Sequence, residues 1–252
     1  MKHAYGMTTA ALAITAATAF AGAGHAASIT INTITPQWAN VLPSPGVTVD
    51  NSLNDTVPEI TLRWGTASFD AVLNPLSQRS GYDFTPQGGT PFVVASPNTP
   101  FLLGAFNHHN FPITGTSLTS ADLSVDIGIA SAPGLINSVF SFTHNETPNS
   151  PQSSCPGDTP PCDDIVTVSN NLGNETFTIG GDIFTFQVLG FSTDGGTTFL
   201  DNFRTVEGQP NPAGLWGSYT SSPISTIPLP AAGWLLLAGI GGLGALRRFR
   251  KT

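Results

Sequence analysis

The feature that most constrains this chain is a two-residue alternation of apolar and polar side chains, which recurs through residues 28–227. In the clearest example, Leu123, Val125, Ile127 and Ile129 lie on one face of the segment 122–130. Successive side chains of a β-strand point to opposite faces, so this pattern predicts a half-buried antiparallel strand. No stretch of the body has helical periodicity of useful length.

Six further segments show the same β-type pattern. They are residues 29–34, 59–64, 139–144, 164–168, 176–179 and 183–191. Turn-forming residues separate them, and Gly180-Gly181 between two such runs is typical of a two-residue hairpin. Short strands at this spacing predict an all-β fold, namely a single antiparallel β-sandwich domain of the jelly-roll kind.

The N-terminal region has the order of a secretory signal peptide. Lys2 supplies a positive start, residues 8–20 form a small and apolar run, and small residues dominate from there to Ala27. The charged start stays in the cytoplasm while the apolar stretch enters the translocon. We expect cleavage after Ala26, which removes residues 1–26 on export. An amphipathic or buried first helix is the alternative, but the run has no polar face.

The C-terminal region contains a long segment without charge. Residues 228–246 carry no charged side chain, and Arg247, Arg248, Arg250 and Lys251 follow directly. Such a segment rises about 28 Å as a helix, close to the hydrocarbon thickness of a bilayer. Basic residues resist translocation, so we expect the basic end to stay in the cytoplasm and the body to lie outside. The pattern predicts a transmembrane helix; a buried core helix is the alternative.

A short motif precedes this apolar segment. After Ile227 it reads Pro228, Leu229, Pro230 and Ala231. Motif, apolar span and basic end together resemble the PEP-CTERM class of bacterial sorting tails, in the variant that opens Val-Pro-Leu-Pro-Ala, with Ile in place of Val. The resemblance implies recognition by an exosortase, a membrane enzyme that cleaves near the motif, and association with exopolysaccharide or biofilm. A permanent tail anchor is the alternative.

These signals suggest a division of the chain into four parts. We expect a signal peptide at 1–26, the β-sandwich at 27–206, a spacer towards the membrane at 207–227 and the sorting tail at 228–252. A body of about 200 residues is long enough to bury one sizeable core.

The body is strongly acidic. It holds all sixteen acidic residues but only three basic ones, Arg63, Arg79 and Arg204, which gives it a formal charge of −13. Such a charge repels phosphate backbones, so nucleic acid is not expected as a partner. The expected partners are the membrane, an exosortase and extracellular polysaccharide.

The chain has two cysteines, Cys155 and Cys162, on either side of a Pro/Gly-rich turn. In an exported protein such a pair predicts a disulfide that closes the loop. A metal site is the alternative, but the nearby Asp158, Asp163 and Asp164 are hard oxygen donors that pair poorly with thiolates.

Histidines stand beside amides in the segment 104–113. Neighbouring residues of a strand point to opposite faces, so His108 and His109 are not expected to reach one site. The pattern favours hydrogen bonding at a strand end over a metal site or a general base. The third histidine of the body, His144, lies in another predicted strand.

This segment and its neighbours also resemble a family. The matching stretches are 63–65, 81–84, 106–113, 146–149, 163–165 and 190–191. They are similar to PEP-CTERM proteins named for a Thr-His-any-Asn motif, and to the related choice-of-anchor K domain. Here the motif reads Asn107, His108 and Asn110, with Asn in place of Thr. The resemblance implies an exported β-rich domain and no known reaction.

An acidic group surrounds the predicted disulfide loop. Glu146, Asp158, Asp163 and Asp164 are hard oxygen donors of the kind that calcium prefers. Their spacing matches no EF-hand, so a solvated acidic loop is the alternative. No other cofactor is expected.

Catalytic signatures are absent from the sequence, including the nucleophile elbow, the zinc-protease helix and phosphate-binding glycine loops. We therefore expect an envelope protein without catalysis. One alternative is a carbohydrate-binding module, which would display Trp38, Trp64, Tyr82 and Trp216 as an exposed row. The other is a hydrolase with two carboxylates in a cleft, whose separation the sequence does not fix.

Overall fold

The computed structural model describes residues 27–53, 58–67, 79–148, 155, 162–170, 175–224 and 239–240. The predicted signal peptide, the sorting motif and the basic end lie outside these ranges. None of the described residues forms a helix long and apolar enough to cross a membrane. Of the predicted span 228–246 only residues 239 and 240 are described, and both are helical.

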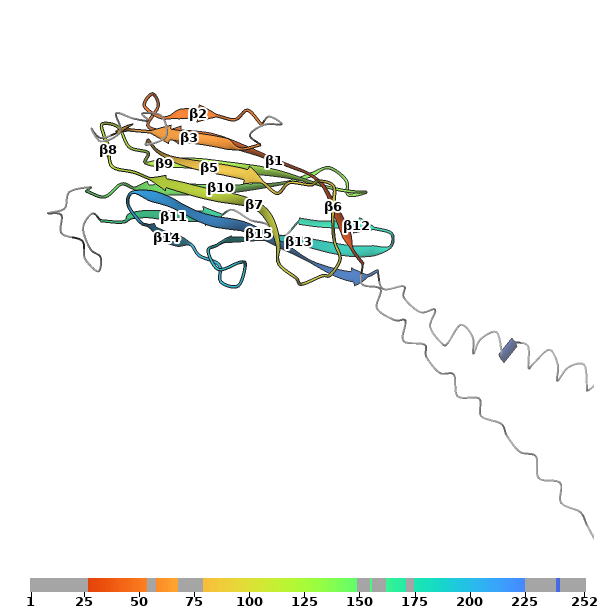
Figure 1. Ribbon diagram of the computed structural model, residues 1–252. Coiled ribbons are helices and arrows are strands. Elements are labelled where there is room, and N and C mark those ends of the chain that lie inside the picture. Colours follow the sequence, from red (N-terminus) through yellow and green to blue (C-terminus); the bar gives the residue numbers. More distant parts are fainter. Residues whose placement is uncertain are drawn as a thin grey trace, which may run out of the picture.

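The body is all-β, as the alternation predicts, and its strands form two main antiparallel sheets (Figure 1). The six-stranded sheet contains, in spatial order, β14 (Asn202–Thr205), β11 (Asp164–Asn170), β10 (Leu135–Asn145), β9 (Ser120–Ile129), β1 (Ile29–Leu42) and β6 (Phe92–Val94). The seven-stranded sheet contains β12 (Glu175–Ile179), β13 (Asp182–Ser192), β15 (Gln209–Pro223), β7 (Phe101–Asn110), β5 (Ser80–Pro86), β3 (Ile60–Trp64) and β2 (Thr48–Asp50). Two short strands, β4 (Thr66–Ala67) and β8 (Ile113–Thr114), pair with each other.

The sheets pack face to face through a core rich in aromatic side chains, which makes the body a β-sandwich. Phe106 of β7 stacks on Phe142 of β10, with ring centroids 5.3 Å apart, so this pair joins the two sheets. The inward side chains of β9, Leu123, Val125 and Ile127, are fully buried, as predicted. Burial of each such side chain contributes about 1.5–3 kcal/mol.

The predicted hairpin at Gly180-Gly181 is confirmed. It joins β12 to β13, and both glycines have positive φ, 62° and 92°. Two consecutive positive φ values define the tight turn that suits the twist of a hairpin, and glycine adopts them without strain.

The predicted boundary at residue 206 is wrong, because most of the expected spacer is strand β15, which lies between β13 and β7. Pro210 and Pro212 give this segment the composition of a spacer. They lie where β15 pairs with β7 alone, since the pairing with β13 begins at Gly214. A strand with an open side tolerates proline, which has no N–H to donate.

Both ends of the body lie at one end of the sandwich. The Tyr219 hydroxyl, near the end of β15, donates to the carbonyl oxygens of Ala27 and Val94, each at 3.0 Å. At the opposite end, Asn110 of β7 pairs with Gln209, where β15 begins.

Candidate functional site

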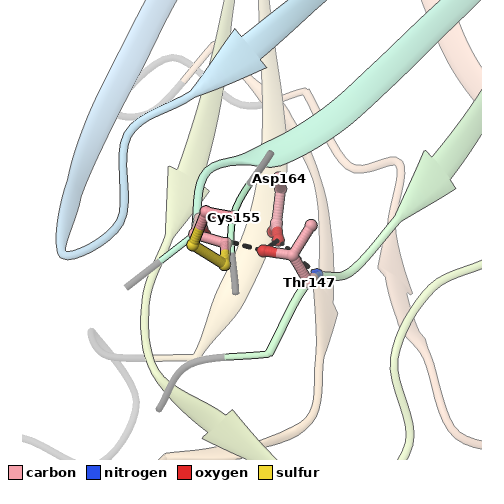
Figure 2. The surroundings of a disulfide bond; sticks show 4 residues. Thr147, Cys155 and Asp164 are labelled. Carbon is pink, nitrogen blue, oxygen red and sulfur yellow. Dashed lines mark hydrogen bonds between the residues drawn. A yellow bond between two sulfur atoms is a disulfide. The ribbon is translucent and has the colours of Figure 1, made fainter. Parts of the chain in front are cut away.

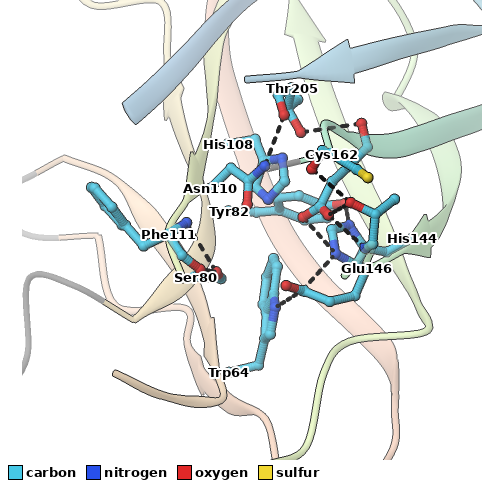
Figure 3. A network of polar contacts seen from close by, with 12 residues as sticks. Trp64, Ser80, Tyr82, His108, Asn110, Phe111, His144, Glu146, Cys162 and Thr205 are labelled. Carbon is cyan, nitrogen blue, oxygen red and sulfur yellow. Dashed lines mark hydrogen bonds and ion pairs between the residues drawn. The ribbon is translucent and has the colours of Figure 1, made fainter. Parts of the chain in front are cut away.

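A polar cluster lies inside the sandwich at the end remote from Ala27 (Figure 3). The seven-stranded sheet contributes Trp64, Tyr82 and His108, and the six-stranded sheet contributes His144 and Asp164. All five are buried. Phe106 precedes His108 by two residues, and Phe142 precedes His144 by two. Residues two apart in a strand point to the same face, so both histidines point inward with these core phenylalanines.

Four rings pack together in this cluster. The His108 centroid lies 5.0 Å from that of Tyr82 and 5.1 Å from that of His144, and Trp64 lies 5.0 Å from His144. Burial, aided by the neighbouring His144, lowers the pKa of His108 well below its usual value. His108 is therefore a neutral imidazole with a free lone pair at physiological pH.

The His144 ring has polar contacts through both nitrogens. Its Nδ1 is hydrogen-bonded to the Tyr82 hydroxyl at 2.8 Å. Its Nε2 lies 3.3 Å from a carboxylate oxygen of Glu146 and 3.5 Å from Oδ2 of Asp164. The indole N–H of Trp64 donates to the same Glu146 oxygen at 3.3 Å. His144 thus faces two carboxylates, while Tyr82 fixes its orientation from behind.

The loop closed by the disulfide orients Asp164 (Figure 2). Cys155 and Cys162 are bonded, as predicted, with their Cα atoms 5.4 Å apart. The Thr147 hydroxyl donates to the carbonyl of Cys162 at 2.7 Å, and its backbone N–H donates to Oδ1 of Asp164 at 2.8 Å. One oxygen of Asp164 is therefore held by Thr147, which is itself bonded to Cys162 of the disulfide, and the other lies towards His144.

Burial raises the pKa of Asp164 to about 8, and repulsion from Glu146 adds to the rise. Burial also raises the pKa of Glu207 to about 7, again with a contribution from Glu146. The three carboxylates lie on or beside one sheet, and among the described residues no Lys or Arg forms an ion pair with Asp164 or Glu207. The site therefore gathers acidic groups, and burial together with mutual repulsion favours the protonated form of Asp164 and Glu207.

Several buried polar atoms of the cluster have no hydrogen-bond partner within the described part of the chain. They are both ring nitrogens of His108, Oδ2 of Asp164 and Oδ1 of Asn110. Leaving such an atom unpaired costs about 1–3 kcal/mol. Asn110 itself is fixed, because its side-chain N–H donates to the carbonyl of Thr205 at 2.7 Å.

Three of these residues have the donor atoms of a metal centre. One ligand atom from each of His108, His144 and Asp164 can be chosen so that all lie within 4.8 Å of one another. Neutral imidazoles and a carboxylate are ligands for divalent metal ions.

The family motif is divided between the two faces of β7. His108 and Asn110 point into the cluster, whereas His109 points outward, where its Nε2 donates to Asp83 at 2.6 Å. Asn107 is also on the outer face, 3.2 Å from that same nitrogen. His108 and His109 are thus on opposite faces, as the strand geometry predicts.

The predicted calcium set is only partly brought together. Glu146 and Asp164 lie in the cluster, Asp163 precedes the buried strand β11 with partial exposure, and Asp158 is outside the described residues. Sequence reasoning did not assign Trp64, Tyr82, His144 or Glu207 to this site. For His144 a signal was present, because it continues the inward series of Phe140 and Phe142.

The expected row of exposed aromatic rings is not formed. Trp38, Trp64 and Tyr82 are buried at 2% exposure or less, and Trp216 is half-buried. The carbohydrate-binding alternative loses the feature that was to distinguish it. Asp164 is also fully buried, which weakens the alternative of a hydrolase with its acids in an open cleft.

No protein-family model matches the chain, and no curated protein shows significant similarity to it.

Proposed function

We propose that the protein is an exported envelope or extracellular-matrix component without catalytic activity, held at the membrane at least transiently by its C-terminal tail. An exosortase is its processing enzyme, and extracellular polysaccharide is its environment. The observation that carries the proposal is the uncharged stretch 228–246 between the motif at 228–231 and the basic end at 247–251. A charge-free segment of bilayer length, stopped by basic residues, is most stable across a membrane.

The disulfide supports export. Disulfides persist in oxidising compartments and are rare in the cytosol. Both cysteines of the chain are used in the bond between Cys155 and Cys162, which closes a short loop just before β11.

The arrangement of the body also agrees with a tail anchor. The tail follows β15, whose fifteen residues extend about 45 Å at the usual rise of a strand. Because β15 starts beside Asn110 and ends near Ala27, the polar cluster lies at the end remote from the tail. A body tethered in this way presents the cluster and the disulfide loop away from the membrane.

The proposal is tested by following the tail in the producing host. Tagged full-length protein is expressed with and without exosortase activity, the envelope is fractionated, and the mature C-terminus is read by mass spectrometry. We expect a C-terminus near residue 231 only when the exosortase is active. The matched control replaces Pro228 and Pro230 by alanine, which preserves the apolar span and prevents cleavage. An intact Thr252 in both strains would refute sorting.

A further inference from the structure

We propose that the buried cluster is a binding site for one divalent transition-metal ion, with His108, His144 and Asp164 as ligands. The three side chains come from three strands in two sheets, and their donor atoms lie within 4.8 Å of one another. Both nitrogens of His108 and Oδ2 of Asp164 are buried without a hydrogen-bond partner among the described residues. A metal ion at the centre of the cluster would give one nitrogen of His108 and Oδ2 of Asp164 a partner.

The surroundings of His144 resemble those of a metal ligand held from behind. Metal-bound histidines usually donate their second ring N–H to an oxygen, which fixes the tautomer and the ring orientation. Here Nδ1 lies 2.8 Å from the Tyr82 hydroxyl, which leaves Nε2 to bind the metal. Nε2 points to the two carboxylates, at 3.3 Å from Glu146 and 3.5 Å from Asp164.

The groups around the donor atoms also favour a cation. Ligand imidazoles must be neutral and ligand carboxylates ionised. Carboxylate oxygens of Glu146 and Asp164 both lie against Nε2 of His144, and among the described residues no Lys or Arg pairs with Asp164. A divalent cation would supply that missing charge, and Glu146 is placed to complete the coordination.

The donor set selects the kind of ion. Two imidazoles with one or two carboxylates suit zinc and its neighbours in the first transition series, whereas calcium takes six to eight oxygen ligands. Zinc holds its ligands at about 2.0–2.2 Å, so binding would draw the three donor atoms somewhat closer than they are here. This inference does not depend on where the protein works.

The test uses the full-length chain, purified in mild detergent and stripped of metal with a chelator. Cobalt(II) is titrated in while its visible absorption is recorded, and bound zinc is measured by elemental mass spectrometry. We expect one ion per chain, with zinc displacing cobalt. Asp164→Asn and His144→Gln should each weaken binding by about 100-fold or more, and Tyr82→Phe by about 10- to 100-fold, because it removes the hydroxyl that orients His144.

The matched controls are Asp83→Asn and His109→Gln, which change the same residue types on the outer face of the sheet. These variants should bind cobalt and zinc like the wild type. Circular dichroism and the intact disulfide establish that each variant is folded, and His108→Leu provides a ligand variant that keeps the core filled. A folded wild type that binds neither ion would overturn the proposal, as would equal affinity in wild type, Asp164→Asn and His108→Leu.

Discussion

The two faces of β7 carry two networks of the same residue types in opposite states. On the outer face His109 donates to Asp83, and the Arg63 guanidinium pairs with the same carboxylate. On the inner face His108 lies near Asp164 of β11, and both have buried atoms with no hydrogen-bond partner in the described part of the chain. The carboxylate of Asp83 thus has two basic side chains as partners, whereas among the described residues Asp164 has no Lys or Arg paired with it.

The two networks differ in whether a positively charged side chain contacts the aspartate. Burial by itself would raise the pKa of Asp83, but hydrogen bonds from His109 and Arg63 outweigh it and lower the pKa below its usual value. Asp164 is buried among carboxylates, and its pKa rises. The direction of each aspartate's pKa shift thus follows from whether hydrogen-bond donors or other carboxylates surround it.

The largest expected effect is on the stability of the His108→Leu variant relative to the wild type, which should change sign between chelator and zinc. In chelator the substitution should leave stability unchanged or raise it by about 1 kcal/mol, because it removes buried polar atoms without partners. With zinc at about 1,000 times its dissociation constant, the wild type should gain about 4 kcal/mol that the variant lacks. Thermal unfolding with and without zinc measures both values. A variant destabilised equally in both conditions would mean that His108 contributes packing alone.

The next effect is on pH dependence. In metal-free protein the pKa of Asp164 rises from 3.8 to about 8, so the folded state keeps a proton that the unfolded state has lost between these values. Stability should therefore fall as the pH rises from about 4 to 8. The pKa of Asp83 is lowered, so its contribution is present above pH 3.8 and is lost on acidification.

Chemical denaturation across this pH range separates the two groups. Asp164→Asn should flatten the fall in stability between about pH 4 and 8 and leave the loss on acidification below pH 3.8, and Asp83→Asn should do the reverse. If both variants keep the wild-type profile, the titrating groups lie elsewhere.

Loss of the disulfide should have a smaller effect, confined to the inner network. Cys155 and Cys162 are separated by 7 residues, and opening a loop of this size costs about 2.5 kcal/mol in the chain-entropy model. The double Cys→Ser variant should also release Thr147 from its position against Asp164. A double-mutant cycle measured by denaturation should show coupling to Asp164→Asn and simple additivity with Asp83→Asn. Equal coupling to both sites would contradict the separation of the networks.

The smallest expected change is that of Asp83→Asn at neutral pH. The substitution removes a charge-assisted pair but leaves Arg63 bonded to the carbonyls of Leu62 and Tyr82. We expect a loss of about 1–2 kcal/mol that shrinks in high salt. An undiminished loss in molar salt would indicate packing and not charge.

The sequence predicted the fold class and about half of the strands, because alternation reports burial directly. It missed β7 and β15, where glycine, proline and asparagine interrupt the apolar series. In the site, it turned His108 and His109 to opposite faces correctly. It did not join His108 to His144, because that contact depends on the packing of two sheets, and no local pattern specifies which strands face each other.

One consequence of the position of β15 is mechanical. The strand runs between β7 and β13, and the tail continues from its end. Ladder hydrogen bonds are perpendicular to the strand, so a pull on the tail loads the bonds on both sides together in shear instead of peeling them one after another. A pull on the tail would thus be resisted by the hydrogen bonds along the whole strand at once.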